Sequence, residues 1–155
     1  IIRIIIIIIN MVFIKLIHDK YENENQNKEH IHNVIKEVNG NPIDKERELM
    51  ICTWGKNKHL PYECEIIFDV SSMSTNVINN ETTRNYTGMD EIIQNSIINH
   101  PKFDYMMEEM LMNIEIGNPN VIGIICNYGK HRSVGMAELL KKFYYEKSII
   151  LHRGI

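Results

Sequence analysis

The chain has 155 residues and a formal net charge of −3, with 44% hydrophobic and 24% charged residues. This composition excludes wholesale disorder, and the length is that of one domain with a sizeable core. The acidic balance argues against a strong, sequence-independent nucleic-acid binder, and three cysteines without a C-x-x-C pair argue against a disulfide framework or a cysteine zinc site. A reducing, cytoplasmic setting is expected.

Residues 1–28 are expected to be an N-terminal extension and linker. Polar side chains interrupt their apolar first half at Arg3, Asn10 and Lys15. No run therefore reaches the roughly 20 apolar residues of a membrane-spanning helix. The first methionine is Met11, so the residues before it are interpreted as an upstream extension or as the end of a fragment. A single domain is then expected over residues 29–155, without a membrane partner.

The first half of this domain is expected to contain one helix and two strands. Apolar residues at helical spacing predict a helix over 30–40 that ends at Gly40. The short apolar runs 49–54 and 65–70 predict buried strands. Residues 71–88 are rich in Ser, Thr and Asn and have no period, so they predict a long loop, a kind of segment that tends to carry function.

The second half predicts a β-α-β unit. Helical periodicity indicates helices over 89–100 and 102–118. The continuous apolar run 121–126 is typical of a strand covered on both faces, and an amphipathic helix over 133–147 and a last strand over 148–152 follow it. We therefore predict the α/β class, with a small, mainly parallel sheet flanked by helices.

The strand-to-helix joint of this unit carries the sequence CNYGKHRS. Ligands of α/β sheets bind at the carboxyl ends of the strands, where helix amino termini present free N–H groups. Gly129 permits the backbone angles of an anion-binding nest, and the planar fork of Arg132 can hold two anion oxygens. The joint therefore predicts a phosphate-binding loop. Its candidate ligand-binding residues are Cys126, Asn127, Tyr128, Gly129, Lys130, His131, Arg132 and Ser133.

The same loop has the C-x5-R spacing, from Cys126 to Arg132, followed by Ser133. This resembles the phosphate-binding loop of the cysteine-dependent phosphatases. The resemblance implies that Cys126 attacks phosphorus as a thiolate while Arg132 holds the phosphoryl oxygens. It also requires an aspartic general acid, for which Asp69 and Asp90 are candidates. The alternative for Cys126 is a buried, inert thiol at a strand end, and both interpretations stay open.

Three further motifs accompany the loop: IIFDV with Asp69, TRNYTGMD with Arg84, and a His-Arg pair after the last strand. Together with CNYGKHRSV they resemble the C-terminal domain of the RNase adapter protein RapZ and its relatives, over about residues 49–154. The resemblance implies a regulatory domain without turnover that binds a phosphorylated amino sugar such as glucosamine 6-phosphate. It places Asp69 and Arg84 among the ligand-binding residues. In the bacterial proteins it also implies interactions with RNA and a ribonuclease.

Several departures from the family pattern matter. Tyr128 replaces a family glycine, Ser71 stands where the family has arginine, and no basic tail associated with RNA binding precedes the end at Ile155. No G-x-x-x-x-G-K-[ST] motif occurs, so nucleotide hydrolysis is not expected. We therefore expect anion binding ahead of RNA binding, with no metal ion and no cofactor. An adapter that binds RNA or protein without a small ligand is the third hypothesis.

Overall fold

The structure is a computed structural model that describes residues 28–74 and 85–155. Residues 1–27, which make up nearly all of the expected N-terminal extension, and the ligand candidate Arg84 lie outside the described residues. The chain forms two compact units by its internal contacts. One comprises the residues up to Asp44 together with Asp104–Asn118, and the other comprises Lys45–Phe103 and Pro119–Ile155.

The first unit contains helix α2 (Lys28–Asn39) and nearly all of helix α4 (Phe103–Gly117). The predicted end of α2 is confirmed. Gly40 has φ +79°, and its N–H donates to the Lys36 carbonyl at 2.9 Å, which is the usual glycine termination of a helix. The apolar stripe of α2 is buried at Ile31, Val34 and Ile35, and α4 buries Met107, Met110 and Met112.

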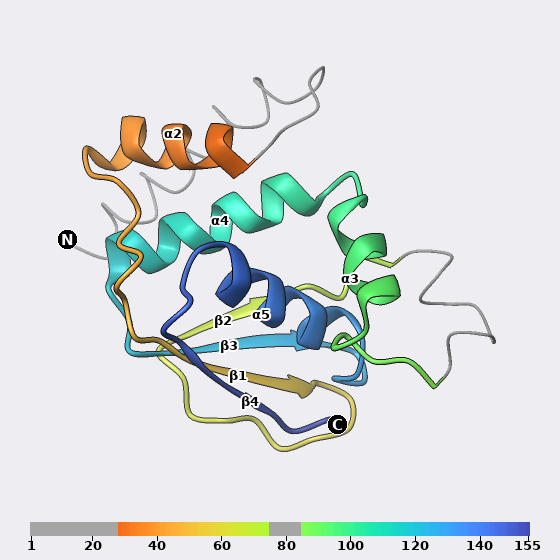
Figure 1. The fold of residues 1–155 in the computed structure, drawn as a ribbon. Helices are drawn as coiled ribbons and strands as arrows, with labels where there is room; N and C mark the ends of the chain where they lie inside the picture. Colours follow the sequence, from red (N-terminus) through yellow and green to blue (C-terminus); the bar gives the residue numbers. More distant parts are fainter. Residues whose placement is uncertain (1–27, 75–84) are drawn as a thin grey trace. The chain divides into compact units, whose positions relative to one another are not determined.

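The second unit is built on a four-stranded parallel sheet (Figure 1). The strands are β1 (Met50–Gly55), β2 (Ile66–Asp69), β3 (Val121–Cys126) and β4 (Ile149–His152), and their order is β2-β3-β1-β4. Every pair is parallel, with β3 and β1 in the centre. Helices α3 (Glu91–Ile98) and α5 (Arg132–Phe143) complete this unit. The predicted α/β class with a parallel sheet is therefore confirmed.

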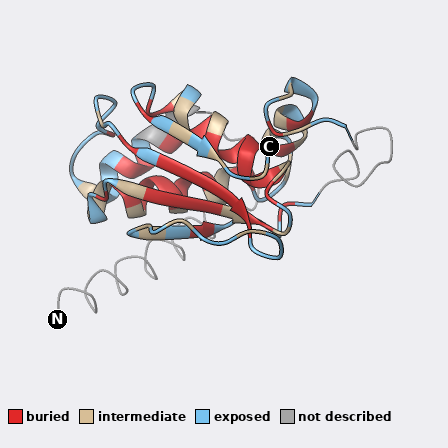
Figure 2. Ribbon diagram, turned by 90° about the horizontal axis from the view of Figure 1, so that it is seen from below, coloured by how far each residue is buried: buried red, intermediate tan, exposed pale blue. Residues whose placement is uncertain are grey.

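The two faces of the sheet are covered differently. Helix α5 lies over the face that carries Thr53 and Cys126. Its Ser133 contacts Cys126, and its Glu138 contacts His152 of β4, whose ring also meets Thr53. The opposite face carries Trp54, whose ring lies 5.8 Å from that of Tyr62 in the segment between β1 and β2. Figure 2 shows the result: the central strands are mostly buried, whereas the edge strands carry exposed positions.

Helix α5 is shorter than its predicted range of 133–147. It ends at Phe143, and the N–H groups of Tyr144 and Tyr145 both donate to the Leu140 carbonyl, at 3.1 and 3.2 Å. Both tyrosines are buried, Tyr145 completely. Their burial ends the regular helix before the turn that leads to β4, which hydropathy periodicity alone does not reveal.

Candidate functional site

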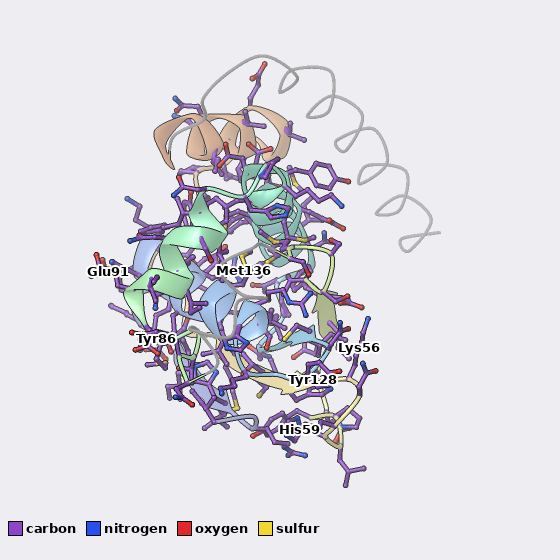
Figure 3. All side chains as sticks on the ribbon, turned by 90° about the vertical axis from the view of Figure 1, so that its right-hand side faces the viewer. Lys56, His59, Tyr86, Glu91, Tyr128 and Met136 are labelled. Atoms are coloured by element: carbon purple, nitrogen blue, oxygen red, sulfur yellow. The ribbon has the colours of Figure 1, made fainter. Side chains whose placement is uncertain are left out.

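The candidate site lies at the carboxyl edge of the sheet, where β2 ends at Asp69, β3 at Cys126 and β1 at Gly55. Figure 3 looks onto this edge and shows Lys56, His59 and Tyr128 gathered in one part of it. Backbone hydrogen bonds join the loops there. The N–H of Lys56 donates to the Cys126 carbonyl at 2.9 Å, and that of Asn57 to the Asn127 carbonyl at 3.0 Å.

The loop after β3 is shaped by backbone packing. Gly129 has φ +72°, and a Cβ built on it would lie 2.3 Å from the Gly55 nitrogen. A Cβ on Gly55 would in turn lie 2.3 Å from the Tyr128 carbonyl carbon, and one on Gly154 would lie 2.1 Å from the Gly129 oxygen. No side chain fits at these three positions, so the loop has a fixed shape against the ends of β1 and β4.

Several N–H groups of this loop remain available as donors. Within residues 28–74 and 85–155, those of Asn127, Tyr128 and Arg132 donate no hydrogen bond. The Gly129 N–H is different, because it donates to Cys126 Sγ at 3.2 Å. The available N–H groups flank the first turn of α5, where the helix dipole favours a negative charge. This arrangement can accept an anion.

Arg132 lies at the end of the loop and is only 7% exposed. Its Nη1 donates to the Ser71 carbonyl and, at 3.0 Å, to Ser74 Oγ. Nη1 makes the hydrogen bonds of this side chain to the residues that the structure describes. One terminal nitrogen therefore fixes the segment after β2, while the rest of the guanidinium can face a ligand.

The sulfur of Cys126 is enclosed. The thiol is 2% exposed and lies 3.2 Å from Ser133 Oγ, in addition to the Gly129 N–H. These contacts connect the end of β3 to the first turn of α5. They are compatible with a structural thiol and with a stabilised thiolate alike.

Asp69 takes part in an ion pair that sequence reasoning missed. Lys56 Nζ lies 2.8 Å from Asp69 Oδ2 and 3.0 Å from Ser71 Oγ, and the Ser71 N–H donates to Asp69 Oδ1 at 2.9 Å. Burial by itself raises the pKa of Asp69, but the hydrogen bonds from Lys56 and Ser71 and the charge of Lys56 hold it below its usual value. The signal in the sequence is the position of Lys56, directly after the glycine that closes β1.

The TGMD segment packs against the same loop. The Gly88 N–H donates to the Lys130 carbonyl at 2.9 Å, and a Cβ on Gly88 would lie 2.1 Å from the Gly135 nitrogen in α5. Asp90 accepts the Thr87 N–H at 2.7 Å and makes no side-chain bond to the start of α3. Its carboxylate therefore closes the turn that brings Gly88 to the loop.

Residues 47–155 match the sequence profile of the RapZ C-terminal domain. The chain belongs to the RapZ C-terminal domain family. A nucleotide-binding protein of Shewanella woodyi is 27% identical over 139 residues, covering 84% of this chain and 49% of the relative. One from Ruminiclostridium cellulolyticum is 29% identical over 136 residues, covering 77% and 46%. The chain thus spans about half the length of the curated relatives it matches.

The RapZ resemblance inferred from the motifs is thereby confirmed, while the ligand roles of individual residues stay predictions. The structure brings the loop from Cys126 to Ser133, Asp69 and the TGMD turn to one edge of the sheet. Among the residues it describes, no three His, Cys, Asp or Glu side chains are grouped to hold a metal ion. None of the helices in that same part of the chain has the length and hydrophobicity to cross a membrane.

The final His-Arg pair of the RapZ motifs makes contacts within the fold. His152 Nδ1 lies 2.7 Å from Thr53 Oγ1 and its Nε2 lies 2.8 Å from Glu138 Oε1, so the ring connects β4 to β1 and α5. The Arg153 guanidinium lies 3.9 Å from the centre of the Tyr62 ring and donates to the Leu60 carbonyl at 2.7 Å. Both side chains hold β4 and the segment between β1 and β2 in place.

Proposed function

We propose that the loop after β3 and the first turn of α5 bind the phosphate group of a phosphorylated sugar, and that the domain acts as a regulatory sensor without turnover. The observation that carries this proposal is the set of N–H groups on Asn127, Tyr128 and Arg132 that donate to no described residue. They lie beside a largely buried guanidinium that uses Nη1 for its hydrogen bonds to the described residues. Such donors match the oxygens of a tetrahedral anion.

The sugar part of the proposal rests on the family and on side chains next to the loop. The RapZ resemblance implies a phosphorylated amino sugar, and the relatives carry the name nucleotide-binding protein, which also denotes a phosphate-bearing ligand. Asp69 and His131 are the proposed contacts to sugar hydroxyls. Arg84 remains a proposed contact as well, although it lies outside the described residues.

Isothermal titration calorimetry with glucosamine 6-phosphate and glucose 6-phosphate tests this proposal. Arg132→Lys keeps the charge but removes the planar fork, so we expect a loss of affinity of about 10- to 100-fold, the usual range for a charged hydrogen bond. Lys147→Met removes a cation that pairs with Glu46, and should leave affinity unchanged. A parent protein that binds neither compound, or an Arg132→Lys variant that binds as the parent does, contradicts the proposal.

A cysteine-dependent phosphatase is the second candidate, favoured by the Gly129 N–H that donates to Cys126 Sγ. An N–H donor at the sulfur is what a thiolate nucleophile requires. The contacts of Asp69 weigh against this residue as the general acid, because both of its carboxylate oxygens are engaged by Lys56 and Ser71. Asp90 remains the other candidate for that role. Hydrolysis of an aryl phosphate by the parent but not by Cys126→Ser supports this candidate. No hydrolysis removes it.

An adapter role toward RNA or a ribonuclease is a further proposal from the family. The basic side chains considered for it are Lys141, Lys142, Lys147 and Arg153. Three of them make contacts within the fold: Lys142 with the Phe143 ring, Lys147 with Glu46, and Arg153 with Tyr62 and Leu60. Binding of structured RNA that weakens steeply with salt supports this role, because phosphate contacts release counterions.

A further inference from the structure

Cys52 and Cys64 lie beside each other on the sheet face opposite α5. Cys52 is two residues before Trp54 on β1, so both side chains point to this face. Cys64 is two residues after Tyr62, whose ring lies 5.8 Å from that of Trp54. Both thiols are free, and they share a hydrogen bond. Two sulfurs from separate segments of the chain are therefore in contact.

A missing side chain on β3 makes room for this contact. Gly123 is the register partner of Cys52. A Cβ built on Gly123 would lie 3.2 Å from Cys64 Sγ and 2.6 Å from Trp54 Cη2. Because adjacent strands lie only about 4.8 Å apart, the sulfur of Cys64 occupies the space next to Cys52 that a side chain at position 123 would take.

The backbone on both sides of Cys64 is held in place. The Glu65 N–H donates to the Val121 carbonyl at 3.0 Å, and the Arg153 guanidinium lies 3.9 Å from the centre of the Tyr62 ring. Cys52 lies inside β1, which pairs with β3 and β4. The two sulfurs thus meet on a fixed backbone, and a disulfide requires only their closer approach, to about 2.05 Å.

We infer that Cys52 and Cys64 are a redox-active pair, which a small disulfide such as glutathione disulfide oxidises to an intramolecular disulfide. Cys64 is the more exposed of the two thiols. Its thiolate attacks one glutathione sulfur and expels a glutathione thiolate, and the Cys52 thiolate then attacks the Cys64 sulfur and expels the second. The two cysteine protons end on the two glutathione thiols, so one disulfide is reduced as the other forms.

Burial governs how readily the pair reacts. It raises the pKa of Cys64 to about 11, with a further contribution from the neighbouring Cys52, and it also raises the pKa of Cys52. The hydrogen bond from Cys64 and the charge of Arg153 partly oppose the rise in the pKa of Cys52. Since only thiolates exchange, the reaction is slow at neutral pH. Reversible pairs of this kind are compatible with a reducing compartment, where lasting structural disulfides are rare.

Incubation of the parent chain with excess glutathione disulfide at about pH 8.5 tests the inference, because more of each thiol is ionised there than at neutral pH. Two of the three thiols should be lost when they are counted in the denatured chain, and dithiothreitol should restore them. Trypsin can cut after Lys56 and Lys58, so the two cysteines fall on separate peptides. Mass spectrometry of the non-reduced digest should find these peptides joined.

Two variants and a stability measurement sharpen this test. Cys64→Ser removes the pair, so both remaining thiols should stay free of any internal disulfide. Cys126→Ser is the matched control, because it removes the third thiol and should leave the bond between Cys52 and Cys64 unaffected. The oxidised parent should unfold at a temperature about 5 to 10 °C higher than the reduced parent, since the bond closes the loop 52–64 in the unfolded chain.

The contrary outcomes are specific. A parent that keeps all three thiols, a glutathione adduct that persists on Cys64, or a bond that involves Cys126 overturns the inference. An oxidised form no more stable than the reduced form does so as well, because the bond would then strain the sheet. The peptide map of the parent decides the question even where a variant does not fold. None of these results depends on phosphate binding at the loop after β3, so the two proposals fail independently.

Discussion

The end of β3 is bordered by two regions that are held in different ways. Toward β1 and β4, Gly129, Gly55 and Gly154 bring backbones so close that no Cβ fits. Toward β2, the contacts are made by side chains, an exposed ion pair and the hydrogen bonds of Arg132. Close contact between backbones allows only one conformation of the loop, whereas polar side chains can exchange their hydrogen-bond partners for a ligand. The first region gives the loop its shape, and the second is suited to recognise what binds there.

The largest expected effect comes from a methyl group in the backbone-packed region. Gly129→Ala combines a φ of +72° with a Cβ placed 2.3 Å from the Gly55 nitrogen, so the free energy of unfolding should fall by about 3 kcal/mol or more. Gly40→Ala is the matched control. Its φ is +79°, but nothing lies within 4 Å of the new Cβ, so only about 1 to 2 kcal/mol of backbone strain is expected.

Urea denaturation of the two glycine variants measures this difference. Equal losses of stability would show that backbone angle alone matters at Gly129. The close packing of the loop against β1 would then contribute nothing measurable to the free energy of unfolding.

An intermediate effect is expected from a buried polar contact away from the loop. Thr53 is completely buried and its hydroxyl meets His152 Nδ1 at 2.7 Å. Thr53→Val keeps the shape of the side chain but removes the hydroxyl that meets His152 Nδ1. The free energy of unfolding should therefore fall by about 1 to 3 kcal/mol. Ligand affinity should not change.

The control for this prediction is Ser148→Ala. Ser148 is 2% exposed, and within the described part of the chain its hydroxyl has no hydrogen-bond partner. Its removal should therefore leave stability unchanged or raise it slightly. Similar losses for both variants in thermal unfolding would contradict the importance of the Thr53 contact.

The smallest effect on stability is expected from the exposed ion pair. Because the pKa of Asp69 is lower in the folded chain than its usual 3.8, the pair stabilises the fold above that pH. Its contribution, at most about 1 kcal/mol for an exposed pair, is lost as the pH falls through the lowered pKa. Asp69→Asn should therefore be slightly less stable than the parent near neutral pH and equal to it in acid. A stability difference that is as large in acid as at neutral pH contradicts this assignment.

The sequence predicts the fold well where periodicity and termination signals agree. The strand at 121–126 and the helix end at Gly40 follow from a continuous apolar run and from a glycine that tolerates positive φ. The end of α5 was missed because Tyr144 and Tyr145 turn inward after the regular helix stops. Burial of aromatic side chains in a turn depends on tertiary packing, which local periodicity does not contain.

The candidate site is predicted in part for a similar reason. The loop from Cys126 to Ser133 is continuous in sequence, so its residue types indicate its chemistry directly. The pair formed by Lys56 and Asp69 joins two strand ends across a third, and only the strand order reveals it. The contacts of Arg132 with Ser71 and Ser74 likewise join residues about 60 positions apart in the chain, which only the fold reveals.

The most direct measurement of the central claim is a titration of the ¹⁵N-labelled chain with glucose 6-phosphate, followed by amide NMR shifts. The amides of Asn127, Tyr128 and Arg132 should move together and saturate with the ligand, because they acquire an anionic acceptor. The amide of Gly129 already donates to Cys126 Sγ and should move less. Saturating shifts elsewhere in the chain, with these three amides unmoved, would contradict phosphate binding at this loop.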